Sequence, residues 1–210
     1  MNVEILPGLD PRQHLEQEAA RFADGGEHTL LWRSAPCVVI GRNQCAEEEV
    51  SAEGLREVPV LRRTTGGGAV YHDPNNINFS FIRQESLPGP MQVHVAPILR
   101  FLRQLGLPVV FSGRNDILLC GRKISGCAMR HDDGRTLVHG TLLFRRDADK
   151  MARYLTPDSE KLLRHGVASV AVRTGELAPY LSAIPDAEAF LLILRDFLDK
   201  NSKPETSGNP

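Results

Sequence analysis

The segment from residue 76 to residue 82 most constrains how this chain can fold. Apolar and polar residues alternate along it, with Ile77, Phe79 and Phe81 set against Asn76, Asn78 and Ser80. A repeat of two residues places the apolar side chains on one face of a β-strand and the polar ones on the other. The pattern predicts a half-buried strand, and therefore a sheet with a core packed against one face.

Strand and helix patterns are interleaved along the rest of the chain. Short apolar runs predict strands over residues 3–6, 29–32, 37–40, 58–61, 69–71, 108–111, 116–119, 122–130 and 136–144, with a turn joining 29–32 to 37–40. Helices are predicted over 11–23, 46–55 and 91–105, and three or four helical pieces over 147–200, broken near 156–157, Gly166 and Pro185. The sequence predicts one α+β domain over residues 1–200 and a disordered polar tail over 201–210.

Charge and composition exclude several classes of protein. Lys and Arg total 25 and Asp and Glu total 26, whereas binding to a phosphate backbone needs a basic surface. The longest apolar run, 189–194, is far shorter than the roughly 20 residues of a membrane helix, and the N-terminus shows no signal-peptide pattern. The four cysteines, at positions 37, 45, 120 and 127, lack metal-binding or redox spacing. We expect a cytoplasmic protein that binds neither nucleic acid nor a membrane.

The first candidate site is a glycine triplet, Gly66 to Gly68, that follows Arg62 and Arg63. Consecutive glycines expose backbone N–H groups to an anionic ligand, and arginines donate in pairs to phosphate or carboxylate. The triplet matches neither the Gly-x-x-x-x-Gly-Lys-Ser/Thr nor the Gly-x-Gly-x-x-Gly phosphate-binding pattern. The alternative is a hairpin turn with both arginines in solvent.

The second candidate segment covers residues 113–126. Asn115 and Asp116 offer oxygen ligands to Mg²⁺, or acceptors for an ammonium group or a sugar hydroxyl. Lys123 lies in a strand-like stretch between Gly121 and Gly126, where it can hold a carboxylate and neutralise charge on an acyl or phosphoryl oxygen. The alternative is a tight hairpin with charged turn residues.

Two further side chains carry reactive chemistry. His139 lies inside an apolar strand, where a histidine is more often a hydrogen-bonded core residue than a catalyst. Cys127 follows Gly126 and is a candidate thiol nucleophile, although no base is adjacent in sequence and free cysteines are usually buried. The residues alone therefore indicate an anion-binding α+β domain with one or two lysine or arginine contacts.

Taken in order, these segments resemble the lipoate–protein ligase A family over about residues 14–200. The matching pieces are 31–32, 38–44, 62–73, 76–79, 113–116, 121–126, 139–143, 154–158 and 166–170. The resemblance implies the fold of biotin protein ligases and class II aminoacyl-tRNA synthetases, a mixed, mainly antiparallel sheet flanked by helices. It also implies activation of lipoate with ATP and Mg²⁺ to lipoyl-AMP, and transfer of the lipoyl group to a lysine of a carrier domain.

The resemblance assigns a role to each candidate residue. Lys123 would hold the lipoate carboxylate and stabilise charge in both steps. Trp32 and Glu18 would line the slot for the dithiolane and its alkyl chain, and His139 would occupy a pocket position of the family. The acyl-adenylate would lie along Arg63, Thr65, Gly66, Gly67 and Gly68, and the nucleotide and metal side would hold His72, Asn115 and Asp116, with Asp116 as the metal ligand.

The resemblance also names the partners and leaves alternatives open. The acceptor would be the E2 subunit of a 2-oxoacid dehydrogenase, the H protein of glycine cleavage, or a related lipoate-binding protein. Bacterial ligases of this family often carry a C-terminal accessory domain, which we expect to be absent here, and some relatives supply it as a separate chain. One alternative is an octanoyl- or lipoyltransferase that forms a thioester on Cys127 without ATP. Another is a lipoyl-AMP-binding regulator or a subunit that needs a partner chain.

Overall fold

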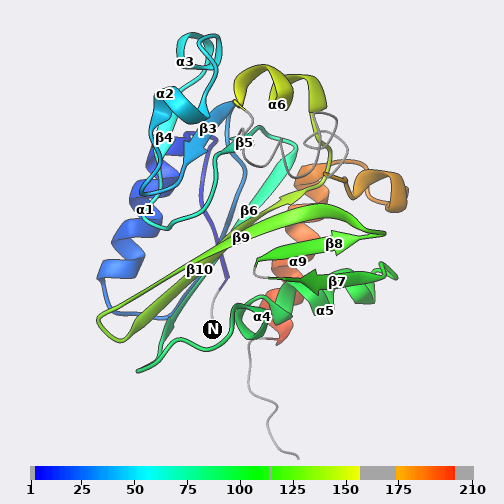
Figure 1. Cartoon of the computed structure of the whole chain (residues 1–210). Helices are drawn as coiled ribbons and strands as arrows, with labels where there is room; N and C mark the ends of the chain where they lie inside the picture. Colours follow the sequence, from blue (N-terminus) through cyan, green and yellow to red (C-terminus); the bar gives the residue numbers. More distant parts are fainter. Residues whose placement is uncertain (1–2, 114, 157–173, 202–210) are drawn as a thin grey trace, which may run out of the picture.

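Two β-sheets form the body of the protein in a computed structural model that describes residues 3–113, 115–156 and 174–201 (Figure 1). The large sheet contains β1 (Val3–Ile5), β2 (His28–Trp32), β6 (Asn76–Gln84), β7 (Val109–Ser112), β8 (Asp116–Leu119), β9 (Arg122–Asp132) and β10 (Arg135–Leu143), in the order β1-β2-β6-β10-β9-β8-β7. The small sheet contains β3 (Cys37–Ile40), β4 (Val60–Arg62) and β5 (Val70–His72), in the order β4-β3-β5.

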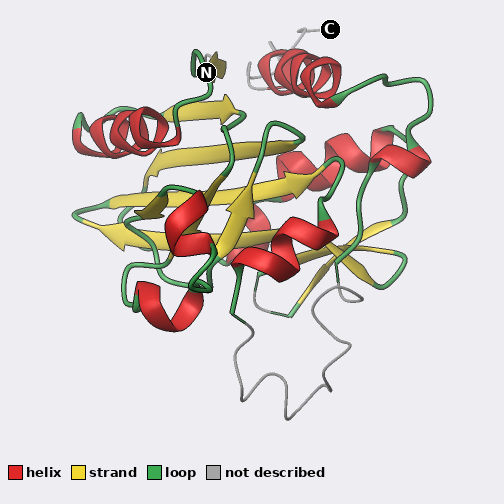
Figure 2. Ribbon diagram, turned by 90° about the horizontal axis from the view of Figure 1, so that it is seen from above, coloured by secondary structure: helices red, strands yellow, loops and turns green. Residues whose placement is uncertain are grey.

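Helices lie on both sides of the large sheet (Figure 2). They are α1 (Pro11–Ala23), α2 (Ala46–Glu49), α3 (Gly54–Glu57), α4 (Met91–His94), α5 (Ala96–Gln104), α6 (Ala148–Tyr154) and α9 (Ala187–Asn201), with a 3₁₀ turn, η1, over Ala178–Tyr180. Only β1 and β2 pair in parallel in the large sheet, and every other pair is antiparallel. The predicted class, a mixed and mainly antiparallel sheet flanked by helices, is confirmed.

The strand connections differ from two of the local expectations. The runs at 29–32 and 37–40 are strands, but β2 enters the large sheet and β3 the small one, so they form no hairpin. Likewise β4 and β5 do not pair with each other, because both lie against β3. The glycine triplet therefore lies on a crossover between two strands rather than on a hairpin turn.

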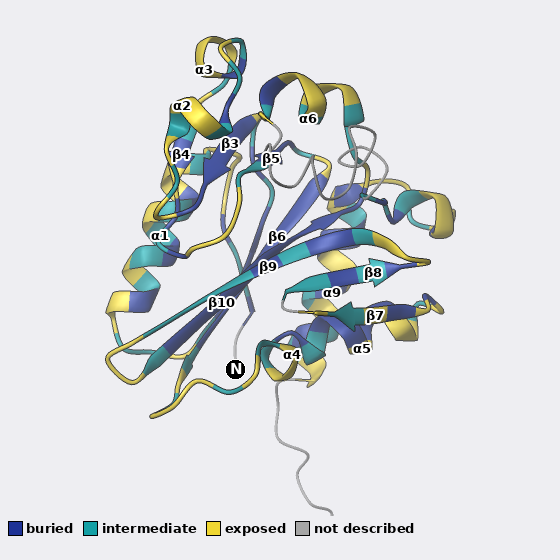
Figure 3. Cartoon of the chain, viewed as in Figure 1, coloured by how far each residue is buried: buried dark blue, intermediate teal, exposed yellow. Residues whose placement is uncertain are grey.

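The strand β6 is buried on both faces, so the prediction of a half-buried strand is wrong. Ile77, Phe79 and Phe81 face the main core, while Asn76 and Asn78 on the other face are each only 2% exposed (Figure 3). The polar face is covered because Ser80 bonds to Glu18 of α1 and because Asn78 faces an internal pocket. The alternation therefore marks a polar interior rather than a solvent-facing surface.

Several predicted helices are shorter or broken. The 46–55 helix is replaced by the two short helices α2 and α3, and the 91–105 helix divides into α4 and α5 at Val95, two residues before Pro97. The C-terminal region contains α6, η1 and α9, with the expected break near Pro185. The break at Gly166, the matching segment 166–170 and the tail residues 202–210 lie outside the described residues. Within the described ranges no helix is long and apolar enough to cross a membrane.

An aromatic cluster packs α5 and α9 against the apolar face of the large sheet. The ring centroids of Phe190 lie 5.4 Å from those of Phe101 and 5.3 Å from those of Phe144, and Phe190 is fully buried. In Figure 1 α9, in orange and red, runs behind this sheet. The core thus lies on one face of β6 and leaves the other face for polar side chains.

We expect Phe190→Ala to lower the free energy of unfolding by about 3–5 kcal/mol, because it removes a buried ring and leaves a cavity. Chemical denaturation measures this change. Ile193→Ala on the same helix is the matched control, since Ile193 is 40% exposed and should cost far less. Equal losses for the two variants would contradict the described packing of α9.

Candidate active site

A pocket lies between the polar face of the large sheet, α1 and the small sheet. It brings together nine of the residues singled out from the sequence: Trp32, Arg63, Gly67, Gly68, His72, Asn115, Lys123, Cys127 and His139. It also takes in residues that were not singled out, among them Leu15, Ser34, Val39, Asn78, Ala128 and Gly140. Within the described part of the chain Glu18, Thr65, Gly66 and Asp116 do not line it.

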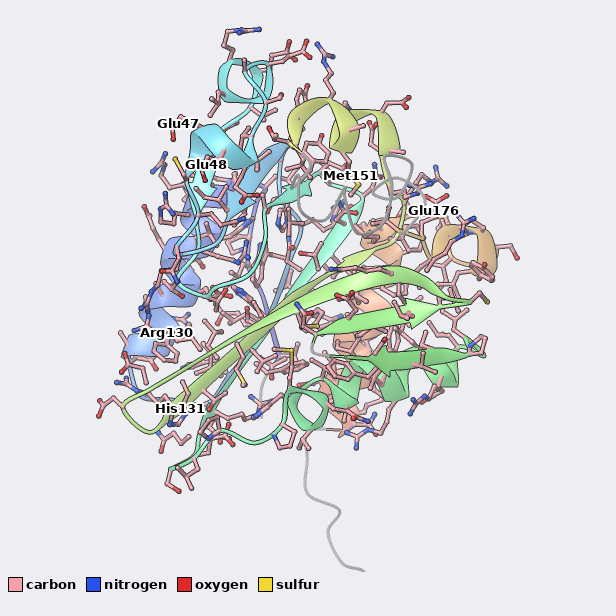
Figure 4. All side chains as sticks on the ribbon, in the orientation of Figure 1. Glu47, Glu48, Arg130, His131, Met151 and Glu176 are labelled. Carbon is pink, nitrogen blue, oxygen red and sulfur yellow. The ribbon has the colours of Figure 1, made fainter. Side chains whose placement is uncertain are left out.

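A β-bulge aims Lys123 at this pocket. Ile117 pairs with Ser125 but Leu118 pairs with Lys123, so Ile124 is the extra residue in β9. The bulge moves the Lys123 side chain over Gly126, where an added methyl group would lie 2.9 Å from both Cε and Nζ. The C-terminal part of β9 extends away from the pocket, and Arg130, which is labelled in Figure 4, lies near that end of the strand.

The partners of Lys123 bear on the predicted metal site. Its Nζ lies 2.7 Å from Oδ1 of Asp116, and the Asn115 side-chain amide donates to the Cys127 carbonyl at 2.9 Å. Asp116 is therefore the counter-ion of the lysine, and Asn115 fastens the β8–β9 hairpin. Among the described residues no group of three or more His, Cys, Asp or Glu side chains could hold a metal.

Arg63 organises the glycine loop over residues 65–68 instead of reaching into solvent. It is 8% exposed, and its Nη2 donates to the carbonyls of Gly66 and Gly68, both at 2.7 Å. Its Nη1 donates to the Val39 carbonyl at 3.1 Å. The loop carbonyls thus turn toward the guanidinium, and no backbone N–H of residues 66–68 donates to a protein acceptor within the described ranges. Such N–H groups form an anion-binding concavity.

Two glycines are required by this close packing. A methyl group at Gly41 would lie 2.1 Å from the Gly67 carbonyl oxygen, closer than any real contact. Gly67 itself has a φ of 93°, in the left-handed region that side chains avoid, and a methyl group there would approach Nη2 of Arg63 to 2.9 Å. The loop therefore depends on glycine at both positions.

A buried hydrogen-bond chain lies behind the loop. Nδ1 of His139 is 2.9 Å from Oε1 of Glu18, and its Nε2 is 2.7 Å from Oγ1 of Thr65. Arg63 Nε donates to the same Oγ1 at 3.1 Å, and the Ser80 hydroxyl donates to Glu18. The polar atoms of Glu18, expected in the acyl slot, and of Thr65, expected along the acyl-adenylate, are thus engaged by neighbouring side chains, and neither residue lines the pocket.

Burial and charge set the protonation of this region. Burial lowers the pKa of Arg63 to about 10, and the Glu18 charge opposes that shift. Burial would raise the pKa of Glu18, but His139, Ser80 and Arg63 outweigh it and hold that pKa below its usual value. Burial, with the charges of Arg63 and His139, lowers the pKa of His72 to about 3. His72 is therefore neutral at physiological pH.

His72 and Asn78 contact each other beside the pocket, where Nδ1 of His72 and Nδ2 of Asn78 are both buried. The other end of the Asn78 amide accepts from the Thr141 hydroxyl at 2.7 Å, which fixes its orientation. Asn78 escaped detection in the sequence because its strand pattern was interpreted as facing solvent.

Comparison with known proteins decides the family. The family described as the lipoyl protein ligase A/B catalytic domain matches residues 11–198. The chain belongs to this family. The probable lipoate-protein ligase A of Mycoplasma genitalium is 39% identical over 181 residues, which is 84% of this chain and 54% of that protein. This member of the ligase A/B family thus spans about half the length of the curated relatives that it matches.

Solved structures confirm the fold of this ligase A/B catalytic domain. A bi-partite lipoate protein ligase from Thermoplasma acidophilum, described with its E2 lipoyl domain, has a TM-score of 0.80 and 26% identity over 95% of this chain and 83% of that one. Biotin protein ligase from Aquifex aeolicus, with a TM-score of 0.52 and 14% identity over 96% of this chain and 70% of that one, shares the fold alone. The predicted likeness to biotin protein ligases is confirmed.

The environment of Cys127 bears on the choice between an ATP-dependent ligase and a transferase that forms a thioester on this residue. The thiol is 3% exposed, and burial raises its pKa to about 12, so the reactive thiolate is scarce at neutral pH. Its Sγ packs in the main core and lies 3.9 Å from Ser125 Oγ. This environment is typical of a structural cysteine rather than a nucleophile.

We expect Cys127→Ala to retain acyl transfer within about threefold of the unmodified protein, because no thioester is needed when an adenylate carries the acyl group. Transfer to a purified acceptor domain measures this. Loss of transfer in a variant that keeps its circular dichroism spectrum would instead support the thioester route. Iodoacetamide should also modify exposed Cys45 and Cys120 well before Cys127.

Proposed function

We propose that residues 1–200 form the catalytic domain of an ATP-dependent lipoate–protein ligase. The observation that carries the proposal is that Lys123 and two glycines of the loop, Gly67 and Gly68, line one pocket, and that the N–H groups of these glycines donate to no acceptor among the described residues. A lysine that can hold a carboxylate and a loop that can hold phosphates are the two anion sites that acyl-adenylate formation requires.

The remainder of the pocket suits an unbranched acyl chain. Leu15, Trp32 and Val39 line it from α1, β2 and β3. On the large sheet the small side chain of Ala128, which pairs with His139, adds little bulk to the pocket. We infer that lipoate lies with its carboxylate at Lys123 and its alkyl chain and dithiolane toward Trp32.

The chemistry then follows in two balanced steps. A carboxylate oxygen of lipoate attacks the α-phosphorus of ATP, pyrophosphate leaves, and lipoyl-AMP forms. The neutral lysine amine of the acceptor then attacks the acyl carbonyl, and the bond between the carbonyl carbon and the phosphate oxygen breaks. AMP leaves, and the nitrogen releases one proton to solvent and keeps the other as the amide N–H. Lys123 screens negative charge in the first step and stabilises the acyl oxygen in the second. Mg²⁺ enters as Mg-ATP and offsets phosphate charge.

The acceptor in this proposal is a protein domain that carries a lipoyl lysine. Support comes from the Thermoplasma ligase, which is described together with its E2 lipoyl domain. E2 subunits, the glycine cleavage H protein and related lipoate-binding proteins are the candidates. A separate accessory chain stays within the proposal as a factor that completes adenylation. The proposal places the reaction in the cytoplasm, where a reducing environment keeps the four free cysteines as thiols.

Formation of the intermediate tests the proposal without an acceptor. The protein is incubated with Mg²⁺, lipoate and ATP labelled at the α-phosphate, and the products are separated by chromatography. We expect labelled lipoyl-AMP that requires lipoate. Absence of the adenylate, both with the chain alone and with an accessory chain of a bi-partite ligase, would contradict the proposed activity.

A further inference from the structure

We propose that Glu18 is a positioning residue for the glycine loop, acting through His139 and Thr65. The inference rests on the proposed function, because it assigns the loop to the nucleotide. The resemblance places Glu18 against the acyl chain, but its side chain is 1% exposed and lies behind His139 rather than in the pocket.

The contacts of this hydrogen-bond chain lead from Glu18 through His139 and Thr65 to Arg63. The Glu18 carboxylate only accepts, so Ser80 Oγ and Nδ1–H of His139 donate to it. The other ring nitrogen of His139, Nε2, lies 2.7 Å from the Thr65 hydroxyl oxygen. The free lone pair of that hydroxyl accepts from Arg63 Nε. The Glu18 carboxylate is thus the first member of a continuous set of contacts that ends at the Arg63 guanidinium.

The Thr65–Arg63 end of this hydrogen-bond chain fixes the conformation of the glycine loop. Thr65 accepts from Arg63 Nε, and Arg63 Nη2 donates to the carbonyls of Gly66 and Gly68. The N–H groups of residues 66–68 donate to no acceptor in the part of the chain that the structure describes. The Thr65 carbonyl also accepts from the Arg42 N–H at 2.8 Å, which ties the 41–44 segment to the loop. Loss of the acceptor at Glu18 releases His139, then Thr65, and finally the guanidinium that shapes the phosphate-binding backbone.

The Glu18–His139 end of this hydrogen-bond chain borders the acyl slot. His139 lines the pocket and pairs across the sheet with Ala128 on one side and Ser80 on the other. Glu18 therefore acts on the nucleotide end of the pocket, although it lies behind the acyl end. This separation distinguishes a positioning role from a slot-lining role.

The experiment measures two affinities in Glu18→Met, which keeps the side-chain volume but removes the acceptor. Calorimetry gives the Kd for lipoate, and then the Kd for a non-hydrolysable ATP analogue with Mg²⁺ and saturating lipoate. We expect the analogue Kd to rise about tenfold or more and the lipoate Kd to stay within about twofold. Glu18→Gln keeps an oxygen acceptor and should restore most of the analogue affinity. Glu16→Gln, at an exposed position of α1, is the matched control and should change neither Kd.

Three outcomes overturn the proposal: a raised lipoate Kd with an unchanged analogue Kd, equal losses of both, or no change in either. Thr65→Val removes the hydroxyl with little change of shape and should give the same split, so it decides the question if Glu18→Met does not fold. In the double variant the two effects should not multiply, because both act through one chain. Both Kd values can be measured without turnover. If the protein forms no adenylate, the proposed function is contradicted, but the two Kd values still test the role of Glu18.

Discussion

Replacement of Lys123 by alanine is expected to lower the rate of lipoyl-AMP formation by about 10²–10³-fold, the loss that follows removal of one well-placed charge-stabilising group. The bulge in β9 directs this lysine over Gly126 and into the pocket, with Asp116 as its counter-ion at 2.7 Å. Its removal leaves the substrate carboxylate and the α-phosphate facing each other with less positive charge between them. The measurement is the rate of adenylate formation from labelled ATP.

Two controls distinguish loss of the Lys123 charge from loss of the folded structure. Lys200→Ala, on the exposed end of α9, should keep the full rate. Thermal unfolding should show Lys123→Ala as stable as the unmodified protein, because Lys123 is partly exposed and borders an open pocket. A folded Lys123→Ala protein with an unchanged rate would remove Lys123 from the mechanism.

The second large effect is expected at Gly67. Gly67→Ala introduces a side chain at a φ of 93° and places it 2.9 Å from the Arg63 guanidinium, so the loop must shift. Because misplacement of a binding group by about 1 Å can cost 10²-fold in rate, we expect a loss of about 10²-fold in adenylate formation. The KM for ATP should rise in parallel.

Gly66→Ala is the matched control for this loss. Gly66 has no left-handed backbone, and an added methyl group would have no neighbour within 4 Å among the described residues. Its rate should stay within a few-fold of the unmodified protein. Equal losses at the two positions would mean that the triplet acts as flexible backbone rather than as a shaped anion site.

The sequence predicted the main sheet well because its strands are short, apolar and separated by turns. It failed on pairing, since no local pattern states that β4 and β5 both lie against β3. It also failed at the 91–105 helix, where Pro97 removes a backbone donor inside an otherwise helical period. The periodicity of a sequence indicates which side chains share one face of a helix or strand. Which element packs against that face depends on the rest of the fold.

The candidate site shows the same division. Lys123, His139 and the glycine triplet could be singled out because their residue types are unusual in a strand or a turn. The role of Arg63 as the organiser of its own loop could not, since it depends on carbonyls that only the folded loop brings together. The resemblance assigns Glu18 to the slot, and its buried contacts with Ser80 and His139, which no sequence pattern indicates, are the basis for proposing that it supports the loop instead.

The surface above the small sheet was also outside what the sequence could predict. Met151 of α6 packs toward the cluster around Tyr71, and Glu47 and Glu48 lie on α2 at the upper left of Figure 4. Arg153 of α6 pairs with Glu53 and Glu57 of the neighbouring segment. Such surface pairs contribute little stability, and they join segments that are about a hundred residues apart in the chain.

The most direct test of the central claim is the intact mass of a purified lipoyl-domain acceptor after incubation with this protein, lipoate and Mg-ATP. The account predicts a mass increase of one lipoyl group, which disappears when ATP is omitted or when the acceptor lysine is replaced. A lipoyl group transferred without ATP would contradict the adenylate mechanism. An unmodified acceptor, in the presence of ATP and of an accessory chain, would contradict the assignment of this pocket as a lipoate–protein ligase site.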